Sequence, residues 1–546
     1  MTKARVLSML SATALVSMMV VALPTAAHAA DPACDGKLTL NSCGGVTSDG
    51  APYAIQVPGN FNGTVILYSH GYRPNVPVPA GIPGYGGYKV TNTAETAPGQ
   101  SGGNMAITQY LLSQGYALTG SGFARQGWNA DSAVATDVEL IGIVKKQFPT
   151  TKKVMAWGQS LGGFITQALA ETHPDLLTAA APMCMAAGTV ENELTMAGDF
   201  LWGVKTLFDP SIQGGNYAAG AAGYAQAMGD LVKFFTVLGK VQAGISSGAW
   251  PDTSSATGQA LAKAGIPVRS ALLLIGLMSG INTQSAHFDS ISGPAGALKL
   301  AFPLAVSPAL AVLENGANAG ALAILAIQDV EGQSGGAIFD NTKTDYAARV
   351  ATGSVVFNVA LGGDEAIAGM LGALSTANPG APRATGNAAA MAKMRALIQH
   401  TGKISIPTVT MVGVADPITP AGASQWLADK YAAQFAAEKA AAMSAYKTTG
   451  AYVPPKKQLV SIWSTTPASY TKFDATAAPI TSTPAAPGTN HCNFTTAQFM
   501  VVAKELVSVD KTGGFVAGSA LATLVRKAGN LSVDPMYRAP ALKFYE

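Results

Sequence analysis

The chain has 546 residues, which is enough for one large elaborated domain or two domains of ordinary size. Hydrophobic residues make up 48% of it and charged residues only 12%, so it can bury a sizeable core. The formal net charge is only +3 and no block of lysine and arginine occurs, so we expect no nucleic-acid partner.

The N-terminus has the features of a secretory signal peptide. Two basic residues, Lys3 and Arg5, precede an apolar run over residues 14–23, and a small-x-small cleavage sequence ends at Ala29. We therefore expect residues 1–29 to be removed and the mature protein to be secreted.

Four cysteines in an exported chain predict two disulfides rather than reactive thiols. Cys34 and Cys43 are close neighbours and are expected to bridge the mature N-terminus, which leaves Cys184 with Cys492. Three pairings are formally possible, so this connectivity is an inference. No spacing resembles a zinc site, and neither a metal nor another cofactor is expected.

The first part of the core, residues 30–185, alternates strands with helices. The predicted strands cover residues 53–57 (as an edge strand), 63–69, 116–120, 153–157 and 178–183, and the predicted helices cover residues 104–114 and 132–148. A Pro/Gly-rich surface loop is expected over residues 74–103. This alternation predicts an α/β fold with a mainly parallel sheet.

One stretch of this part has the pattern of a nucleophile elbow. The apolar strand that ends at Trp157 leads directly into Gly-Gln-Ser-Leu-Gly over residues 158–162, and a helical pattern continues from Phe164. Strand, sharp turn and helix are the context in which Gly-x-Ser-x-Gly places a serine hydroxyl above the edge of a sheet. Ser160 is therefore the candidate nucleophile.

The pattern alone is weak evidence in a chain with 60 glycines. It recurs around Ser101, Ser246 and Ser334, but no strand leads directly into any of these three serines. We expect them to lie in glycine-rich loops.

The alternation of strands and helices stops over residues 186–405, which are rich in Ala, Gly, Leu and Met. Helices are predicted there over residues 217–237, 269–278 and 319–327. The most apolar part contains Lys299, Pro303 and Pro308, so its uninterrupted length falls short of the roughly 20 residues of a membrane span. We expect a helical cap inserted over the active site; the alternative is a helical domain remote from it.

The second part of the core covers residues 406–546. A strongly apolar strand begins at Pro407 and ends directly before Asp416. Helices are predicted over residues 422–446 and 496–507, with a possible strand over residues 459–463.

Acyl transfer by a serine needs a base that takes its proton and a carboxylate that orients the base. In a fold with this elbow the order along the chain is serine, acid, histidine. Asp416 follows its strand at the carboxyl end, where catalytic loops gather, and His491 comes later, so these two residues fit the order. The alternatives are Asp474 as the acid, His173, His287 or His400 as the base, and a helix-capping role for Asp416.

The residues after the strand that ends at Ser69 are candidates for an oxyanion hole. We expect its donors to be the backbone N–H groups of Tyr72 and Leu161, each worth about 3 kcal/mol of barrier. We expect His70 to be structural.

The set Ser160, Asp416 and His491, together with His70-Gly71, resembles the α/β-hydrolase superfamily. The resemblance covers residues 50–185 and 405–510 and leaves out the cap. Within the superfamily the chain is similar to secreted bacterial esterases, including the tannase and feruloyl-esterase type, in which a cysteine beside the serine is bridged to one directly after the histidine. Here Cys492 follows the histidine but position 159 is glutamine, so the resemblance implies Cys184 as the partner. Residues 115–126 and 171–174 also resemble secreted peptidases of the prolyl-oligopeptidase and tripeptidyl-aminopeptidase type.

The resulting hypothesis is a secreted serine esterase that forms an acyl-enzyme. Its substrate would be a small-molecule or polymeric ester with a hydrophobic acyl or aryl group, and no integral membrane segment is expected in the mature chain. The alternative is a secreted peptidase, for which an acidic residue of the cap would capture a peptide N-terminus; the candidates are Glu191, Glu193 and Asp199. A non-enzymatic binding protein with this fold would lack a residue of the catalytic triad. Here a serine, an acid and a histidine are all present, so this third class is not favoured.

Overall fold

The computed structural model describes residues 31–287, 306–467, 470, 472, 480, 482–540, 542 and 544. The predicted signal peptide, residues 299 and 303 of the apolar stretch, and Asp474 lie outside the described residues.

The described strands form one ten-stranded sheet in the order β1-β2-β3-β5-β4-β6-β7-β8-β9-β10. Strands β5, β4, β6, β7, β8 and β9 are mutually parallel, whereas β1, β2 and β3 at one end and β10 at the other pair antiparallel. The strands are β1 (Ala33–Cys34), β2 (Leu40–Val46), β3 (Pro52–Pro58), β4 (Thr64–Ser69), β5 (Ala117–Ser121), β6 (Lys153–Gln159), β7 (Ala179–Met183), β8 (Thr408–Gly413), β9 (Leu459–Ser464) and β10 (Leu531–Ser532).

The central strands are buried on both faces, as their nearly continuous apolar sequences predict. Every residue of β4, β7 and β8 is buried. One face of the sheet is covered by α1 (Ala106–Ser113), α13 (Thr496–Thr512) and α14 (Gly518–Ala528), and the other by α2 (Ala130–Gln147), α3 (Leu161–Thr172) and the first turns of α12 (Ala421–Thr449). The predicted α/β fold with a mainly parallel sheet is confirmed.

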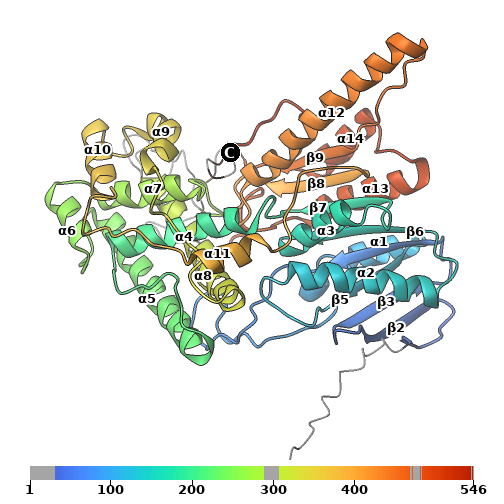
Figure 1. Cartoon of the computed structure of the whole chain (residues 1–546), viewed down its shortest axis with the longest axis horizontal. Helices are drawn as coiled ribbons and strands as arrows, with labels where there is room; N and C mark the ends of the chain where they lie inside the picture. Colours follow the sequence, from blue (N-terminus) through green and yellow to red (C-terminus); the bar gives the residue numbers. More distant parts are fainter. Residues whose placement is uncertain are drawn as a thin grey trace, which may run out of the picture.

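Eight described helices lie between β7 and β8 and gather at one side of the sheet, on the left in Figure 1. We call these helices the cap. They are α4 (Val190–Leu207), α5 (Gly220–Ser247), α6 (Ala256–Lys263), α7 (Val268–Ser279), α8 (Val306–Ser334), α9 (Tyr346–Phe357), α10 (Asp364–Ala373) and α11 (Ala388–Arg395). Buried side chains of the cap form one continuous cluster with those between the sheet and α2 and α3, so cap and core share a hydrophobic interior.

Helix α8 is long and apolar enough to cross a membrane by length and composition, over Pro308–Ser334. However, 72% of its most apolar window is buried inside the protein. It packs against α4, α5 and α7, so here it serves as the central helix of the cap.

A buried carboxylate of α8 joins the cap to two loops of the core. Asp329 accepts hydrogen bonds from Asn75 Nδ2 at 2.7 Å and from the backbone N–H of Trp128 at 2.6 Å, and it forms an ion pair with Arg125. Gln333 Nε2, one turn further along α8, donates to the same carboxylate at 3.2 Å. These contacts fix α8 against the loop that contains Trp128.

The prediction that residues 53–57 form an edge strand is wrong. The corresponding strand β3 lies between β2 and β5, and all seven residues of β2 pair with it. Strand β2 was not recognisable because its sequence, Leu-Asn-Ser-Cys-Gly-Gly-Val, has two glycines and no alternation of apolar and polar residues.

The predicted loops around Ser246 and Ser334 are also wrong. Ser246 lies in the last turn of α5, and Ser334 is the final residue of α8. Glycine has a low helix propensity, but burial of an apolar face outweighs that preference in these long helices. Ser101 lies in the short 3₁₀ turn Gln100–Gly102.

A buried carboxyl group behind β4 gives the fold a pH-dependent stability. Asp137 of α2 is fully buried and accepts a hydrogen bond from Ser69 Oγ at 2.8 Å, and burial raises its pKa from 3.8 to about 8. The folded protein therefore holds a proton that the unfolded chain releases above pH 4, so this group lowers stability as the pH rises toward 8.

We expect Asp137→Asn, which imitates the protonated carboxyl group, to remove the part of the pH-dependent loss of stability that comes from this residue. The free energy of unfolding, measured by urea titration from pH 5 to pH 8, should fall less steeply with pH in the variant, by up to about 1.4 kcal/mol per pH unit. Asp175→Asn, at an exposed position, is the matched control. Equal slopes in Asp137→Asn and the wild type would contradict the assignment.

Candidate active site

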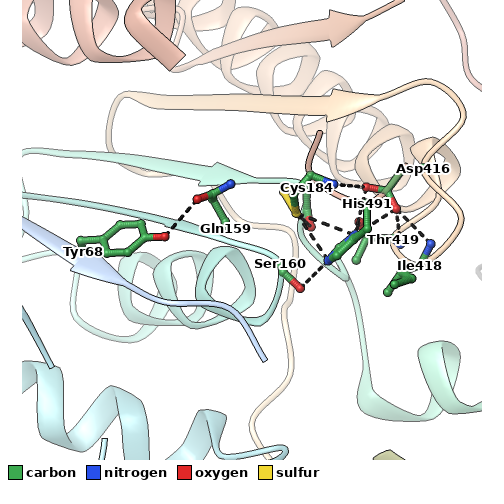
Figure 2. The surroundings of a disulfide bond; sticks show 9 residues. Tyr68, Gln159, Ser160, Cys184, Asp416, Ile418, Thr419 and His491 are labelled. Atoms are coloured by element: carbon green, nitrogen blue, oxygen red, sulfur yellow. Dashed lines mark hydrogen bonds and ion pairs between the residues drawn. A yellow bond between two sulfur atoms is a disulfide. The ribbon is translucent and has the colours of Figure 1, made fainter. Parts of the chain in front are cut away.

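Ser160 occupies a sharp turn between β6 and α3. Its backbone angles are φ 57° and ψ −125°, which a residue other than glycine rarely adopts. The turn directs the hydroxyl away from both elements and toward His491, as Figure 2 shows. The strand, turn and helix predicted around this residue are therefore all present.

The turn requires glycine at its flanks because three backbone segments meet there. A Cβ atom on Gly158 would lie 2.2 Å from the carbonyl oxygen of Gly162. A Cβ atom on Gly162 would in turn lie 2.0 Å from the carbonyl oxygen of Ser69, at the end of β4. The Gly-x-Ser-x-Gly pattern thus reflects the close approach of α3 to the neighbouring strand.

The structure brings the three residues predicted to act together into one hydrogen-bonded row (Figure 2). His491 Nε2 lies 2.7 Å from Ser160 Oγ, and His491 Nδ1 lies 3.0 and 3.1 Å from the two carboxylate oxygens of Asp416. In this geometry the neutral imidazole donates from Nδ1 to the carboxylate and accepts the serine proton at Nε2. Ser160 is thereby placed next to a base.

Asp416 is completely buried, and both of its carboxylate oxygens accept hydrogen bonds from backbone N–H groups. Its Oδ1 accepts hydrogen bonds from the backbone N–H groups of Ile418 at 2.9 Å and Thr419 at 3.0 Å. Its Oδ2 accepts one from the N–H of Cys492 at 3.0 Å. The carboxylate therefore caps the turn after β8 and orients the imidazole at the same time.

Both expected disulfides are present. Cys34 bonds to Cys43 with an S–S distance of 2.02 Å, and Cys184 bonds to Cys492 with an S–S distance of 2.06 Å. The second bond connects the end of β7 to the residue directly after His491, so it restrains the loop that carries the imidazole. It also removes the Cys492 thiolate as a metal ligand, although the residue lies close to Asp416 and His491.

Backbone geometry restrains the histidine loop further. Asn490 has a φ of 61° and Cys492 a φ of 51°, so both neighbours of His491 adopt a left-handed conformation. Cys184 across the disulfide has a φ of 38°. Such conformations persist only where the surroundings hold them, and they are common at functional sites.

The other candidate histidines do not contact Ser160. His400 is buried, with Nε2 donating to the carbonyl of Phe164 at 2.9 Å and Nδ1 accepting from the N–H of Gly188 at 3.2 Å. The Nδ1 atom of His287 contacts the carboxylate of Glu314 in the cap. His173 ends α3, at the opposite end from Ser160.

His70 is structural in its environment, as expected. Its ring is buried against Phe123, with 4.8 Å between the ring centroids, and Nδ1 lies 2.7 Å from the carbonyl oxygen of Gly71. Burial lowers the pKa of the imidazole to about 4, so His70 is neutral at pH 7.

Both residues predicted to form the oxyanion hole line the space in front of Ser160. Leu161 begins α3, and its N–H belongs to the first turn of a helix, where backbone donors lack partners within the helix. Tyr72 lies on the other side, after Gly71, whose Cβ position would be 3.3 Å from Ser160 Cβ. Their role as donors remains a prediction.

Two pockets meet at Ser160 and Tyr72. The first, which we call the cap pocket, lies beneath α4 and α8 and is a narrow space lined mainly by apolar side chains. The second, which we call the outer pocket, is wider and more open, and polar side chains of the loop after β4, together with His491, contribute to its lining. The sequence suggested an apolar cap but gave no sign of the outer pocket.

Position 159 holds a glutamine, whereas esterases of the tannase and feruloyl-esterase type carry a cysteine beside the serine. The glutamine side chain forms a hydrogen bond instead of a disulfide. Gln159 Oε1 accepts a hydrogen bond from the hydroxyl of Tyr68 at 3.0 Å (Figure 2). Tyr68 lies on the adjacent strand β4, so this bond joins the ends of two strands beside the nucleophile.

Comparisons with known proteins give distant structural matches only. No protein-family model matches the chain, and no curated protein matches its sequence. Among solved structures, feruloyl esterase B from Aspergillus oryzae aligns with a TM-score of 0.35 and 13% identity, over 88% of this chain and 83% of that one. An esterase from the same organism aligns with a TM-score of 0.31 and 12% identity, over 78% and 71% of the two chains. An acylaminoacyl peptidase from Pyrococcus horikoshii aligns with a TM-score of 0.19 and 16% identity, over 27% and 22%.

We expect Gly162→Ala to disrupt the elbow, because the new methyl group would meet the carbonyl oxygen of Ser69. The variant should lose most of the labelling of Ser160 by a fluorophosphonate and unfold at a lower urea concentration than the wild type. Gly142→Ala in α2 is the matched control, since nothing lies within 4 Å of its Cβ position. This control should be stabilised by about 0.5–1 kcal/mol. Equal labelling of Gly162→Ala and the wild type would contradict the packing argument.

Proposed function

We propose that the protein is a secreted serine hydrolase that cleaves carboxylic esters through Ser160, His491 and Asp416. The observation that carries the proposal is the 2.7 Å distance between Ser160 Oγ and His491 Nε2, in an imidazole whose other nitrogen contacts a buried carboxylate. A hydroxyl, a base and an orienting acid in this row are the groups that nucleophilic acyl transfer needs.

The reaction proceeds in two halves. Ser160 Oγ attacks the ester carbonyl while its proton moves to His491 Nε2, and the tetrahedral intermediate then collapses and expels the alcohol, which takes that proton. Water next attacks the acyl-enzyme and gives a proton to His491 Nε2. Collapse of the second intermediate releases the carboxylic acid, and the proton returns to Ser160 Oγ. Asp416 stabilises the imidazolium in both halves.

Negative charge on the carbonyl oxygen is stabilised by backbone donors in this proposal. Leu161 and Tyr72 line the space in front of Ser160, their N–H groups are the proposed donors, and the N-terminus of α3 adds the favourable end of its dipole. No metal or organic cofactor takes part.

The disulfide bonds support the proposal that the protein is exported. Two disulfides among the described residues suit an oxidising compartment rather than the cytosol. The signal peptide over residues 1–29 remains a prediction from the sequence.

We expect Ser160→Ala to abolish hydrolysis of p-nitrophenyl esters and covalent labelling by a fluorophosphonate. Asp416→Asn should lower kcat by about 10⁴-fold, because the imidazole is then held in the wrong tautomer. Spectrophotometric rates and mass spectrometry of the labelled peptide measure both effects. Adduct formation at Ser101, Ser246 or Ser334 would overturn the site.

A peptidase activity is the second candidate, because one carboxylate of the cap lines the cap pocket. Glu193 of α4 lies there, whereas Glu191 pairs with Arg395 outside the pocket and Asp199 is buried against Arg349. A carboxylate at this place could bind the amino group of a peptide N-terminus.

Aminoacyl p-nitroanilides test this second candidate. If it holds, Glu193→Gln should raise the KM for these anilides at least tenfold, whereas Glu365→Gln on the exposed side of α10 should leave it unchanged. Rapid cleavage of p-nitrophenyl esters with no cleavage of anilides would leave the esterase as the function.

A further inference from the structure

We propose that the enzyme acts on esters of an apolar carboxylic acid with a hydrophilic, hydroxyl-rich alcohol, and that Ala323 of α8 limits the length of the acid. The inference rests on the proposed function. It assigns the acyl group to the cap pocket and the alcohol to the outer pocket.

The position of the general acid decides which pocket takes which half of the ester. The leaving alcohol must receive its proton from His491 Nε2, so it lies on the side of Ser160 where the imidazole is exposed. His491 lines the outer pocket, and it is not among the described residues that line the cap pocket. The alcohol therefore leaves through the outer pocket, and the acyl group extends under the cap.

The cap pocket suits an apolar acyl group. Helix α8 presents one face to it, with Ala319, Leu322, Ala323 and Ala326 at helical spacing, and α4 contributes Leu194, Met196 and Phe200. Glu193 is the single charged side chain among the described residues that line it. Burial of each methylene group there is worth about 0.8 kcal/mol, so longer acyl chains should be preferred until the pocket is full.

Ala323 is positioned to set that limit. It is 5% exposed, and Ala319 and Ala326 lie about one turn away on either side of it, so methyl groups form this strip of the pocket wall beside Leu322. Asp329 on the same helix holds α8 against the loop of Trp128, which also lines the pocket. Because the wall cannot easily move away, a larger side chain at position 323 takes up space that the acyl chain would occupy.

The outer pocket suits an alcohol with several hydroxyl groups. Arg73 and Glu95 form an ion pair in its wall, and Arg73 Nη1 also donates to the carbonyl of Thr93 at 2.8 Å. The hydroxyls of Thr91 and Thr93 lie 2.9 Å apart at its exposed edge. These groups can donate to and accept from hydroxyl groups of an alcohol in addition to their bonds to one another, whereas an aliphatic alcohol would make no such bonds.

The acyl assignment is tested with p-nitrophenyl acetate, butyrate, hexanoate and octanoate. For the wild type, kcat/KM should rise about fourfold per added methylene until the pocket is full. Ala323→Leu should lower the ratio of octanoate to acetate at least tenfold, and Ala323→Val should lower it less. Ala317→Leu, the same substitution on α8 outside the pocket lining, should keep the wild-type ratio. Active-site titration with a fluorophosphonate corrects each rate for misfolded protein.

The alcohol assignment is tested with two octanoate esters, monooctanoylglycerol and ethyl octanoate. The wild type should prefer the glycerol ester. The double variant Thr91→Val/Thr93→Val should lower the ratio of kcat/KM for the glycerol ester to that for the ethyl ester severalfold, because hydrogen bonds to the alcohol are lost.

The outcomes separate this inference from the proposed function. If Ser160 is not labelled and no ester is cleaved, the proposed function fails. If esters are cleaved but the ratio of octanoate to acetate does not respond to Ala323→Leu, or short acids with long aliphatic alcohols are preferred, the function stands and the two-pocket assignment is overturned.

Discussion

The contact between the end of β4 and the start of α3 is the constraint on which the site depends. Backbone atoms of Ser69 and Gly162 approach so closely that only a hydrogen atom fits between them, and the tight turn at this contact holds Ser160 at φ 57° and ψ −125°. The serine is therefore raised above the sheet at the carboxyl ends of the parallel strands. Loops after β8 and after β9 end at the same edge, and they bring the acid and the base to it.

Much of the core was predictable because its signals are local. Continuous apolar runs identified the buried strands, and only Ser160 among the four candidate serines combined such a run with a following helical pattern. The acid was recognisable because Asp416 directly follows a buried strand. The base was recognisable by chain order and by elimination. These features lie within a few residues of each other or follow the order of a known topology, so no knowledge of distant contacts was needed.

The parts that the sequence did not predict depend on contacts between distant residues. Strand β2 is stabilised by pairing with β3 and by the Cys34–Cys43 bond rather than by its own composition. Both pockets also form between residues that are far apart in the sequence. The sequence does not mark the alanines of α8 as pocket residues, because α4 and the elbow lie opposite them only in the folded protein. Arg73 likewise meets Glu95 only after the loop beyond β4 has folded back on itself.

The bond between Cys184 and Cys492 encloses the whole cap, since 308 positions separate the two cysteines. A protease that cut the backbone anywhere between them, in an exposed cap loop for example, would leave a nicked molecule whose two pieces stay covalently joined beside the nucleophile. In an environment rich in proteases, such a protein could be clipped at its periphery and still keep the elbow and the imidazole on one connected framework.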